Sequence, residues 1–477
     1  MIGRIQEEKE LNRLYEKNEA QFVAVYGRRR VGKTYLIDQT FEGRITFRHA
    51  GLSPEITEPE HLLEKQLEHF YNSLEIHGME KCDKPKDWLE AFLMLEKFLQ
   101  KIDDGKTRQL IFIDELPWLD TPRSNFLMAF EAFWNTWACH RKNLMLVVCG
   151  SANSWILDNL INAHGGLYNR VTYEIKLEPF NLKECEDFFK SKNVKLSKYD
   201  VTQSYMIFGG IPYYLGYFDG EKSLAQNVDD IMFSKTAKLK NEFDRLFASI
   251  FSKPDVMKNI VKLLATKNAG FTRTEISQKL KISTGGGLTK KLNALINSDF
   301  IVNYVPFGFS KREEHFKLAD PFCLFYLHFF DGSKKLNEKF WQQNVTSQAL
   351  SSWRGFAFEN VCFNHIKQIK NALGISGVVS TESAWSKRSD DEQGTQIDML
   401  ISRNDNVINM CELKFYSDDF SVSKEYYKTL MHRENILSKE ISPKMTIHNT
   451  LITTFGLEKN EYAGFFSNVI TLEQLFC

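Results

Sequence analysis

The sequence predicts an α/β protein with several domains, the first of which is built on a parallel sheet. The chain has 477 residues, which is too long for one ordinary hydrophobic core. Residues 1–245 alternate apolar, strand-like runs with helical runs, as a parallel sheet covered by helices does. The pattern changes near residue 250 and again near residue 340. We therefore expect domains at 1–245, 250–330 and 340–477.

A glycine-rich loop is the most informative motif. Residues 27–34 fit G-x-x-x-x-G-K-[ST]. An apolar run at 21–26 predicts a buried strand before the loop, and residues 35–41 predict a helix after it. Successive backbone N–H groups in such a loop face nucleotide phosphates. The predicted ATP site comprises Gly27, Arg28, Arg29, Arg30, Val31, Gly32, Lys33, Thr34 and Tyr35.

Within this loop, Lys33 is expected to reach the β- and γ-phosphates, and the Thr34 hydroxyl to join the shell of Mg²⁺. Arg28, Arg29 and Arg30 could add positive charge near the phosphates. A solvated or interface role for these arginines is an equal alternative.

A second apolar strand, at residues 110–113, ends in Asp114 and Glu115. Asp114 is expected to hold Mg²⁺, directly or through water, and Glu115 to polarise the water that attacks the γ-phosphate. The alternative is a core strand that ends in a solvated turn. The glycine loop upstream favours the catalytic interpretation.

Two further residues are candidates for sensing the γ-phosphate. Ser151 follows a third apolar strand at 144–149, and it could also be part of a simple Ser/Asn turn. Arg170 precedes a strand-like run at 171–175 and could act as an arginine finger in cis or in trans. It could equally be an ordinary surface arginine.

Together these motifs resemble the archaeal-type branch of the AAA+/STAND P-loop ATPases. The resemblance rests on Gly3-Arg4 with the acidic helix that follows, the GRRRVGKT loop, the IFIDE strand, the CGS strand end, and the GGIPYYL run at 209–215. It implies an ATP-driven switch whose helical lid begins near the GGIPYYL run. Relatives of this kind form rings or stay monomeric until triggered, so an oligomer is possible.

Residues 250–330 predict a winged helix-turn-helix. A helix at 256–266, a second helix opened by Thr272 and Glu275 in a capping box, a third at 288–298 and a hairpin from 301 follow that plan. Residues 251–301 carry nine Lys/Arg and three Asp/Glu, an excess of six positive charges. We expect DNA to bind through this segment and the C-terminal domain. An intramolecular packing role is the alternative.

Residues 340–477 contain a separate set of candidate residues. The strand-like runs 396–401 and 407–414 carry Asp398 and Glu412-x-Lys414, and a hairpin would bring these side chains together. Glu359 lies on a preceding apolar helix whose face holds Phe358, Cys362, Ile366 and Ile369. Glu359, Asp398 and Glu412 could bind a metal ion, while Lys414 orients or activates the attacking water.

This set resembles the core of PD-(D/E)xK nucleases, which have an α/β restriction-endonuclease-like fold. The resemblance implies metal-dependent phosphodiester cleavage. Three hypotheses remain open: an ATPase coupled to a nuclease-like domain, an ATP-dependent DNA-binding regulator, and a signalling ATPase whose C-terminal domains contact a protein partner. A hairpin with a surface salt bridge is the structural alternative.

The composition sets the class of protein but not its partner. Lys+Arg and Asp+Glu both total 61, so the net charge indicates no partner. The eight cysteines form no CxxC pair, which favours a reducing cytoplasm over a disulfide or zinc framework. The N-terminus has no apolar signal region, and no apolar stretch is long enough for a membrane span. The expected protein is soluble and cytoplasmic.

Overall fold

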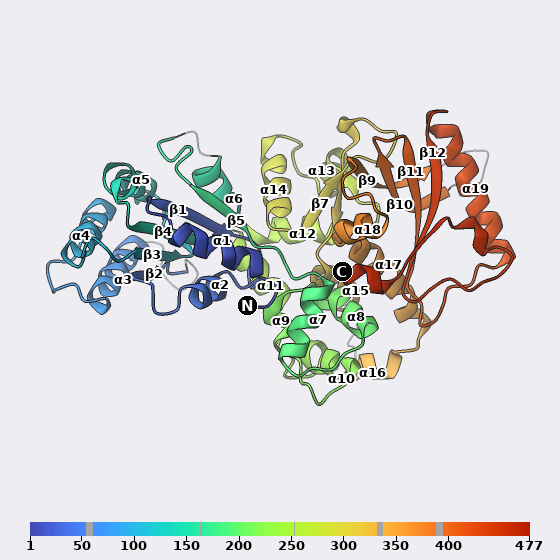
Figure 1. The fold of residues 1–477 in the computed structure, drawn as a ribbon, viewed down its shortest axis with the longest axis horizontal. Coiled ribbons are helices and arrows are strands. Elements are labelled where there is room, and N and C mark those ends of the chain that lie inside the picture. The colour runs from blue at the N-terminus through green and yellow to red at the C-terminus, as the bar shows by residue number, and fades with distance from the viewer. Residues whose placement is uncertain (54–60, 152, 163–164, 252, 332–336, 388–394) are drawn as a thin grey trace. The chain divides into compact units, whose positions relative to one another are not determined.

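The computed structural model describes residues 1–53, 61–151, 153–162, 165–251, 253–331, 337–387 and 395–477 (Figure 1). Its contacts divide the chain into two compact units. Unit 1 contains Met1–Pro179 and Ala248–Ser252, and unit 2 contains Phe180–Phe247 and Lys253–Cys477. The finer division into domains 1–245, 250–330 and 340–477 stays a prediction.

Five parallel strands form the sheet of unit 1, in the order β2-β3-β4-β1-β5. The strands are β1 (Gln21–Tyr26), β2 (Phe47–Ala50), β3 (Gln109–Asp114), β4 (Leu144–Gly150) and β5 (Tyr173–Lys176). The predicted parallel sheet is confirmed. Because β4 lies between β1 and β3, the segments that follow these three strands meet at one edge of the sheet.

The helices of unit 1 cover a sheet whose three central strands are buried along their whole length. They are α1 (Ile5–Tyr15), α2 (Lys33–Thr40), α3 (Leu62–Ile76), α4 (Trp88–Lys101), α5 (Phe126–Thr136) and the short α6 (Asn153–Ile156). Alternate β1 residues Phe22, Ala24 and Tyr26 share one apolar core with α3, α4 and α5. Since side chains alternate along a strand, Val23 and Val25 face the opposite side of the sheet.

Unit 2 begins with a helical segment. Its elements are α7 (Leu182–Ser191), α8 (Lys198–Phe208), α9 (Pro212–Leu215), α10 (Leu224–Val228) and a π-helical turn at Asp229–Phe233. The helix α11 (Glu242–Ile250) follows, and its residues from Ala248 onward are assigned to unit 1. The first three residues of the GGIPYYL run, Gly209, Gly210 and Ile211, separate α8 from α9, and the last four form α9. Gly210 has a φ of 64°, and a Cβ there would lie 2.1 Å from the Phe180 carbonyl oxygen. Only glycine fits that position without movement of the backbone.

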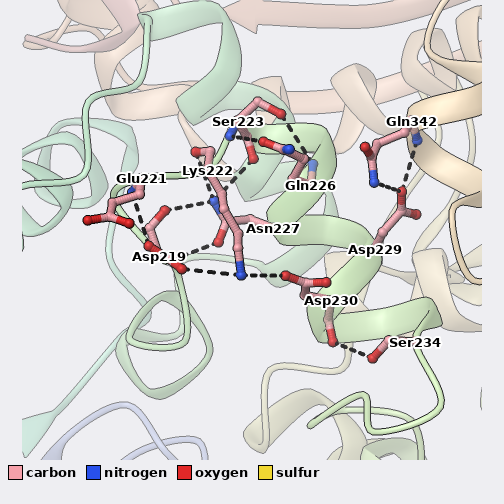
Figure 2. Close-up of polar contacts among 10 residues, drawn as sticks. All are labelled: Asp219, Glu221, Lys222, Ser223, Gln226, Asn227, Asp229, Asp230, Ser234 and Gln342. Carbon is pink, nitrogen blue, oxygen red and sulfur yellow. Dashed lines mark hydrogen bonds and ion pairs between the residues drawn. The ribbon is translucent and has the colours of Figure 1, made fainter.

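The buried carboxylate of Asp229 fixes this helical segment to α16 (Phe340–Asn344) (Figure 2). It accepts hydrogen bonds from the backbone N–H groups of Trp341 at 2.7 Å and Gln342 at 3.0 Å. The Gln342 side-chain amide adds a third bond at 3.0 Å. The neighbouring Asp230 instead pairs with Lys222 at 2.9 Å on the exposed side. Asp229 therefore joins segments that lie more than a hundred residues apart in sequence.

Residues 254–318 form three helices and a small antiparallel sheet. The elements are α12 (Pro254–Leu264), β6 (Phe271–Thr272), α13 (Arg273–Leu280), α14 (Gly286–Asn297), β7 (Ile301–Tyr304) and β8 (His315–Leu318), with sheet order β6-β8-β7. The capping box of Thr272 and Glu275 is confirmed at the start of α13. The three expected helices are present, with ends shifted by up to two residues.

The apolar helix expected around Glu359 is two helices, so that prediction was wrong. The structure has α17 (Gln348–Asn364) and α18 (Ile366–Ala372), preceded by α15 (Pro321–Phe329). His365 interrupts the helix. Its Nδ1 lies 2.7 Å from the Val361 carbonyl oxygen, and its Nε2 accepts the Leu182 N–H at 2.9 Å. Burial lowers the pKa of His365 to about 4, so the neutral ring makes both bonds.

A second five-stranded sheet, ordered β13-β12-β11-β10-β9, forms the C-terminal part of unit 2. Its elements are β9 (Ser380–Lys387), β10 (Thr395–Arg403), β11 (Val407–Lys414), α19 (Lys424–Glu440), β12 (Thr446–Thr453), β13 (Asn468–Ile470) and α20 (Leu472–Leu475). The expected β10–β11 hairpin is confirmed, with Met399 opposite Cys411. Across the described residues, no helix has the length and apolar character that a membrane crossing needs.

Candidate functional site

The glycine loop connects β1 to α2 and needs glycine at both of its ends. Gly27 has a φ of 147°, and a Cβ there would lie 2.2 Å from the Leu177 carbonyl oxygen. Gly32 has a φ of 95° and caps the N-terminus of α2. At Gly27 the backbone passes so close to Leu177 that a side chain would not fit. At Gly32 the chain enters the helix in a left-handed conformation, which glycine adopts most readily. The spacing of the motif follows from these two constraints.

Lys33 lies buried at the start of α2. Its ammonium donates hydrogen bonds to the carbonyl oxygens of Gly27 at 2.9 Å and Arg28 at 3.1 Å. Burial lowers the pKa of Lys33, while the negative charges of Glu115 and Asp114 oppose that shift. The Lys33 ammonium therefore lies inside the loop. A bound phosphate would give it an anionic partner in place of the two neutral carbonyl oxygens.

Thr34 and Asp114 meet across the sheet edge. The Thr34 hydroxyl donates a 2.6 Å hydrogen bond to Oδ2 of Asp114. Oδ1 of the same carboxylate accepts the backbone N–H of Glu115 at 2.9 Å. A hydroxyl and a carboxylate side by side are oxygen ligands of the kind that Mg²⁺ prefers, so these two residues fit the expected ion.

Glu115 is held by Ser151, which follows β4. The Ser151 N–H donates to Oε2 of Glu115 at 3.1 Å, and the Ser151 hydroxyl lies 3.1 and 3.0 Å from the two carboxylate oxygens. Glu115 itself has a left-handed backbone, with a φ of 46°. Ser151 is buried, so this contact fixes the direction in which the glutamate points.

Arg4 is a loop-supporting residue to which sequence reasoning gave no role. Its buried guanidinium donates to the Val31 carbonyl oxygen at 3.1 Å and to the Glu178 carbonyl oxygen at 2.7 Å. The loop is thereby tied to the segment that follows β5. The only sequence signal was the Gly3-Arg4 pair within the family resemblance, because no local pattern predicts a contact across 27 or 174 positions.

The remaining candidates of this region lie in different environments. Arg28 is buried, Arg29 and Arg30 are half-buried, and Tyr35 is exposed. Arg170 lies in the turn before β5 with an exposed side chain. Among the described residues, it makes no hydrogen bond or ion pair with Lys33, Asp114 or Glu115. The structure therefore brings together Lys33, Thr34, Asp114, Glu115 and Ser151, but not Arg170.

In the C-terminal cluster, Glu412 on β11 is fully engaged by cationic and phenolic partners. Its carboxylate pairs with Lys414 at 2.6 Å and with Arg433 of α19 at 2.6 Å, and it accepts a hydrogen bond from the Tyr426 hydroxyl. Burial acts to raise the pKa of Glu412, but Lys414 and Arg433 outweigh burial and the pKa is lowered. Glu412 is therefore ionised, and the two cations beside it balance its negative charge. Arg433 and Tyr426 were not predicted.

Asp398 and Glu359 complete this cluster from β10 and α17. Asp398 accepts the Leu413 N–H at 3.2 Å, and burial together with Glu412 and Glu359 raises its pKa to about 7. Glu359 accepts a hydrogen bond from Asn268, and burial raises its pKa as well. Within the described residues, no three His, Cys, Asp or Glu side chains form a group that could hold a metal ion.

The geometry of unit 1 defines a class of protein. A glycine loop, a buried lysine and an Asp-Glu pair meet at the carboxyl edge of a parallel sheet, which is the arrangement of a P-loop NTP-binding domain. Residues 2–218 match the family described as an ATPase domain predominantly from Archaea. This part of the chain is therefore similar to that family of ATPase domains.

Other similar proteins extend over more of the chain. An uncharacterized protein of Methanocaldococcus jannaschii is 25% identical over 452 residues, covering 91% of this chain and 92% of its own length. A Walker-type ATPase of Pyrococcus abyssi is similar over 69% of this chain and 96% of its own, with 16% identity and a TM-score of 0.46. The ORC2 protein of Aeropyrum pernix, in ADPNP-ADP complexes, is similar over 73% and 96%, with 13% identity and a TM-score of 0.40.

Proposed function

We propose that this chain binds and hydrolyses ATP in its N-terminal domain and uses that cycle to control binding of DNA by residues 251–301 and the C-terminal domain. One observation supports the proposed hydrolysis: two side-chain contacts lie together at one edge of the parallel sheet. Thr34 contacts Asp114, and Ser151 contacts Glu115, both beside the buried ammonium of Lys33.

In this proposal each side chain has one role. Lys33 binds the β- and γ-phosphates, and Glu115 orients and polarises the attacking water. Ser151 positions Glu115 and senses the γ-phosphate. Thr34 and Asp114 would hold Mg²⁺, which supplies positive charge to the phosphates when bound. Arg170 does not contact these side chains, so we assign it a role only in trans, from a second copy of the chain.

We assign DNA binding to α12, α13, α14 and the sheet β6-β8-β7, interpreted as a winged helix-turn-helix. Lys290 is exposed on α14, and Lys291 beside it bonds to the Gly287 carbonyl oxygen at 3.2 Å. The segment 251–301 carries six more positive than negative charges, which suits contact with phosphates.

The ATPase rate with and without duplex DNA tests this proposal. We expect stimulation by DNA that weakens as salt rises, because phosphate contacts release counterions. Lys290→Ala with Lys291→Ala should reduce the stimulation and leave the DNA-free rate unchanged. No DNA or RNA binding at low salt, together with an intact ATPase, would instead favour a signalling ATPase with a protein partner.

A second candidate function is phosphodiester cleavage by the C-terminal domain, which resembles PD-(D/E)xK nucleases. One observation favours it: Asp398 contacts β11 beside Glu412, whose carboxylate touches Lys414. The three carboxylates do not form a three-ligand group in this structure, so we derive no cleavage step through a metal ion. Supercoiled plasmid with Mg²⁺ or Mn²⁺ tests the idea, with Glu412→Ala and Lys414→Ala as the variants that should lose any cleavage.

A further inference from the structure

Unit 2 contains a cavity of about 430 Å³ that the proposed ATPase and nuclease sites do not use. Its walls come from α12 and the loop after it, from β8, and from one side of α15 and α17. This volume lies within the range of about 300–1,000 Å³ that small-molecule sites occupy. The cavity is therefore large enough for a ligand of several functional groups.

Lys317 of β8 lines this cavity and is 6% exposed. Among the residues that the structure describes, its ammonium makes no hydrogen bond and no ion pair. Its ammonium lies 5.0 Å from the centre of the Phe363 ring, and the carboxylates of Glu359 and Asp398 act on it only from a distance. Lys317 is therefore a largely buried side chain whose ammonium has no hydrogen-bond acceptor among the described residues, so an anion that enters the cavity could pair with it.

A second polar group in the same wall has no partner. Asn360 of α17 is 5% exposed, and its side-chain amide makes no hydrogen bond within the described part of the chain. Most buried amides are hydrogen-bonded, and those that are not need an explanation. The other lysines of the wall differ, because Lys262 pairs with Asp331 at 2.7 Å and Lys267 lies 3.9 Å from Glu275. The two unpartnered groups are thus the two most deeply buried polar residues of this wall.

We propose that this cavity binds a nucleotide, with its phosphate against Lys317 and Asn360. Three lysines and one aspartate line the cavity, so its charge suits an anion. An ammonium binds phosphate as a point charge, and the Asn360 amide can donate a further bond. The wall also carries Leu324, Trp353 and Phe356, which offer an apolar and aromatic surface to a base.

The nucleotide has two possible sources, a free mononucleotide or one residue of a single strand. The site lies outside the glycine loop, so its test needs neither ATP hydrolysis nor cleavage. Binding of dTMP and of a short oligothymidylate is measured by calorimetry on the full chain and on the Lys317→Met and Asn360→Leu variants. Lys262→Met is the matched control, because it removes a lysine of the same wall that already has a partner.

We expect Lys317→Met to weaken binding by about tenfold or more, Asn360→Leu by a smaller factor, and Lys262→Met by less than about threefold. If dTMP binds with this pattern, the source is a free nucleotide. If only the oligothymidylate does, the source is a strand. Binding that survives in both Lys317→Met and Asn360→Leu would overturn the proposal.

Thermal unfolding separates the proposal from a rival in which Lys317 only neutralises Glu359 and Asp398. As part of an empty ligand site, Lys317→Met removes a buried, unpartnered charge, so its melting temperature without ligand should equal or exceed that of the parent. A lowered melting temperature with no probe bound by the parent would assign Lys317 to charge balance. If Lys317→Met fails to fold, Asn360→Leu decides by its effect on probe binding.

Discussion

The Thr34 hydroxyl and the Asp114 carboxylate form a 2.6 Å hydrogen bond although 80 positions separate them in sequence. The bond crosses the width of β4, since the strands that lead to these residues are not neighbours in the sheet. The fold itself therefore holds these two oxygen-bearing groups side by side. Because folding already orders these two side chains, nucleotide binding loses less conformational entropy.

Lys33→Ala should abolish ATP binding while the fold is kept. Within the described residues, the ammonium bonds to the carbonyl oxygens of Gly27 and Arg28, so the substitution removes the group that we expect to bind phosphate. Calorimetric titration with ATP measures the effect, and Lys9→Ala on the exposed side of α1 is the control. An ATP affinity in Lys33→Ala equal to that of the control would show that this lysine does not bind phosphate.

Glu115→Gln and Ser151→Ala should separate catalysis from binding. The amide keeps the shape of the side chain but cannot polarise water as a carboxylate does, so turnover should fall about 10²–10⁴-fold with ATP affinity kept. Ser151→Ala removes one of the groups that hold Glu115 and should cause a smaller loss of the same kind. Steady-state phosphate release measures both. A fall in affinity rather than in turnover would place Glu115 in binding.

Arg4→Met should weaken the loop from a distance. The variant loses bonds to the carbonyl oxygens of Val31 and Glu178, so we expect a loss of about 1–3 kcal/mol in unfolding free energy together with weaker ATP binding. Arg13→Met is the control, because Arg13 is an exposed arginine of α1, the helix that begins directly after Arg4. Urea unfolding and calorimetry give the two numbers. Equal effects in Arg4→Met and Arg13→Met would exclude a role in supporting the loop.

Asp229→Asn should destabilise unit 2 more than Asp230→Asn does. Asp229 accepts three hydrogen bonds in a buried position, whereas Asp230 makes an exposed ion pair with Lys222. We expect a loss of about 1.5–3 kcal/mol in unfolding free energy for Asp229→Asn and below about 1 kcal/mol for Asp230→Asn. Urea unfolding checks the order, and the reverse order would refute it.

Local sequence patterns predicted the strands and the loop well, because their signals are short-range. The apolar runs that become β1 and β11 have the expected ends, and both loop glycines have the left-handed or close-packed backbone that the motif needs. Contacts that depend on packing between distant segments were not predictable. Arg4 and Arg433 reach their partners only after folding, and the helix break at His365 depends on a bond to Leu182. Periodicity alone cannot reveal such contacts.

Asp398 should make the stability of unit 2 depend on pH. Burial, with Glu412 and Glu359, raises its pKa from 3.8 to about 7. Between these values the folded protein keeps a proton that the unfolded chain has lost. The raised pKa of Asp398 therefore adds its whole contribution to the unfolding free energy below about pH 4. This contribution decreases as the pH rises to about 7.

Asp398→Asn removes this titration while keeping the size of the side chain. Urea unfolding at pH 5 and pH 8, with EDTA present to exclude metal ions, gives the change in unfolding free energy for each protein. We expect the parent to lose about 1–3 kcal/mol more than Asp398→Asn over this interval. Glu412 has the opposite effect on the pH dependence, because its lowered pKa favours the folded state at higher pH. This effect is present in both proteins, so it largely cancels in the comparison.

Asp405→Asn, an exposed change in the β10–β11 turn, should behave like the parent. If the parent and Asp398→Asn change equally between pH 5 and pH 8, Asp398 is ionised throughout this range, and its buried carboxylate must then be balanced by the cations of this cluster.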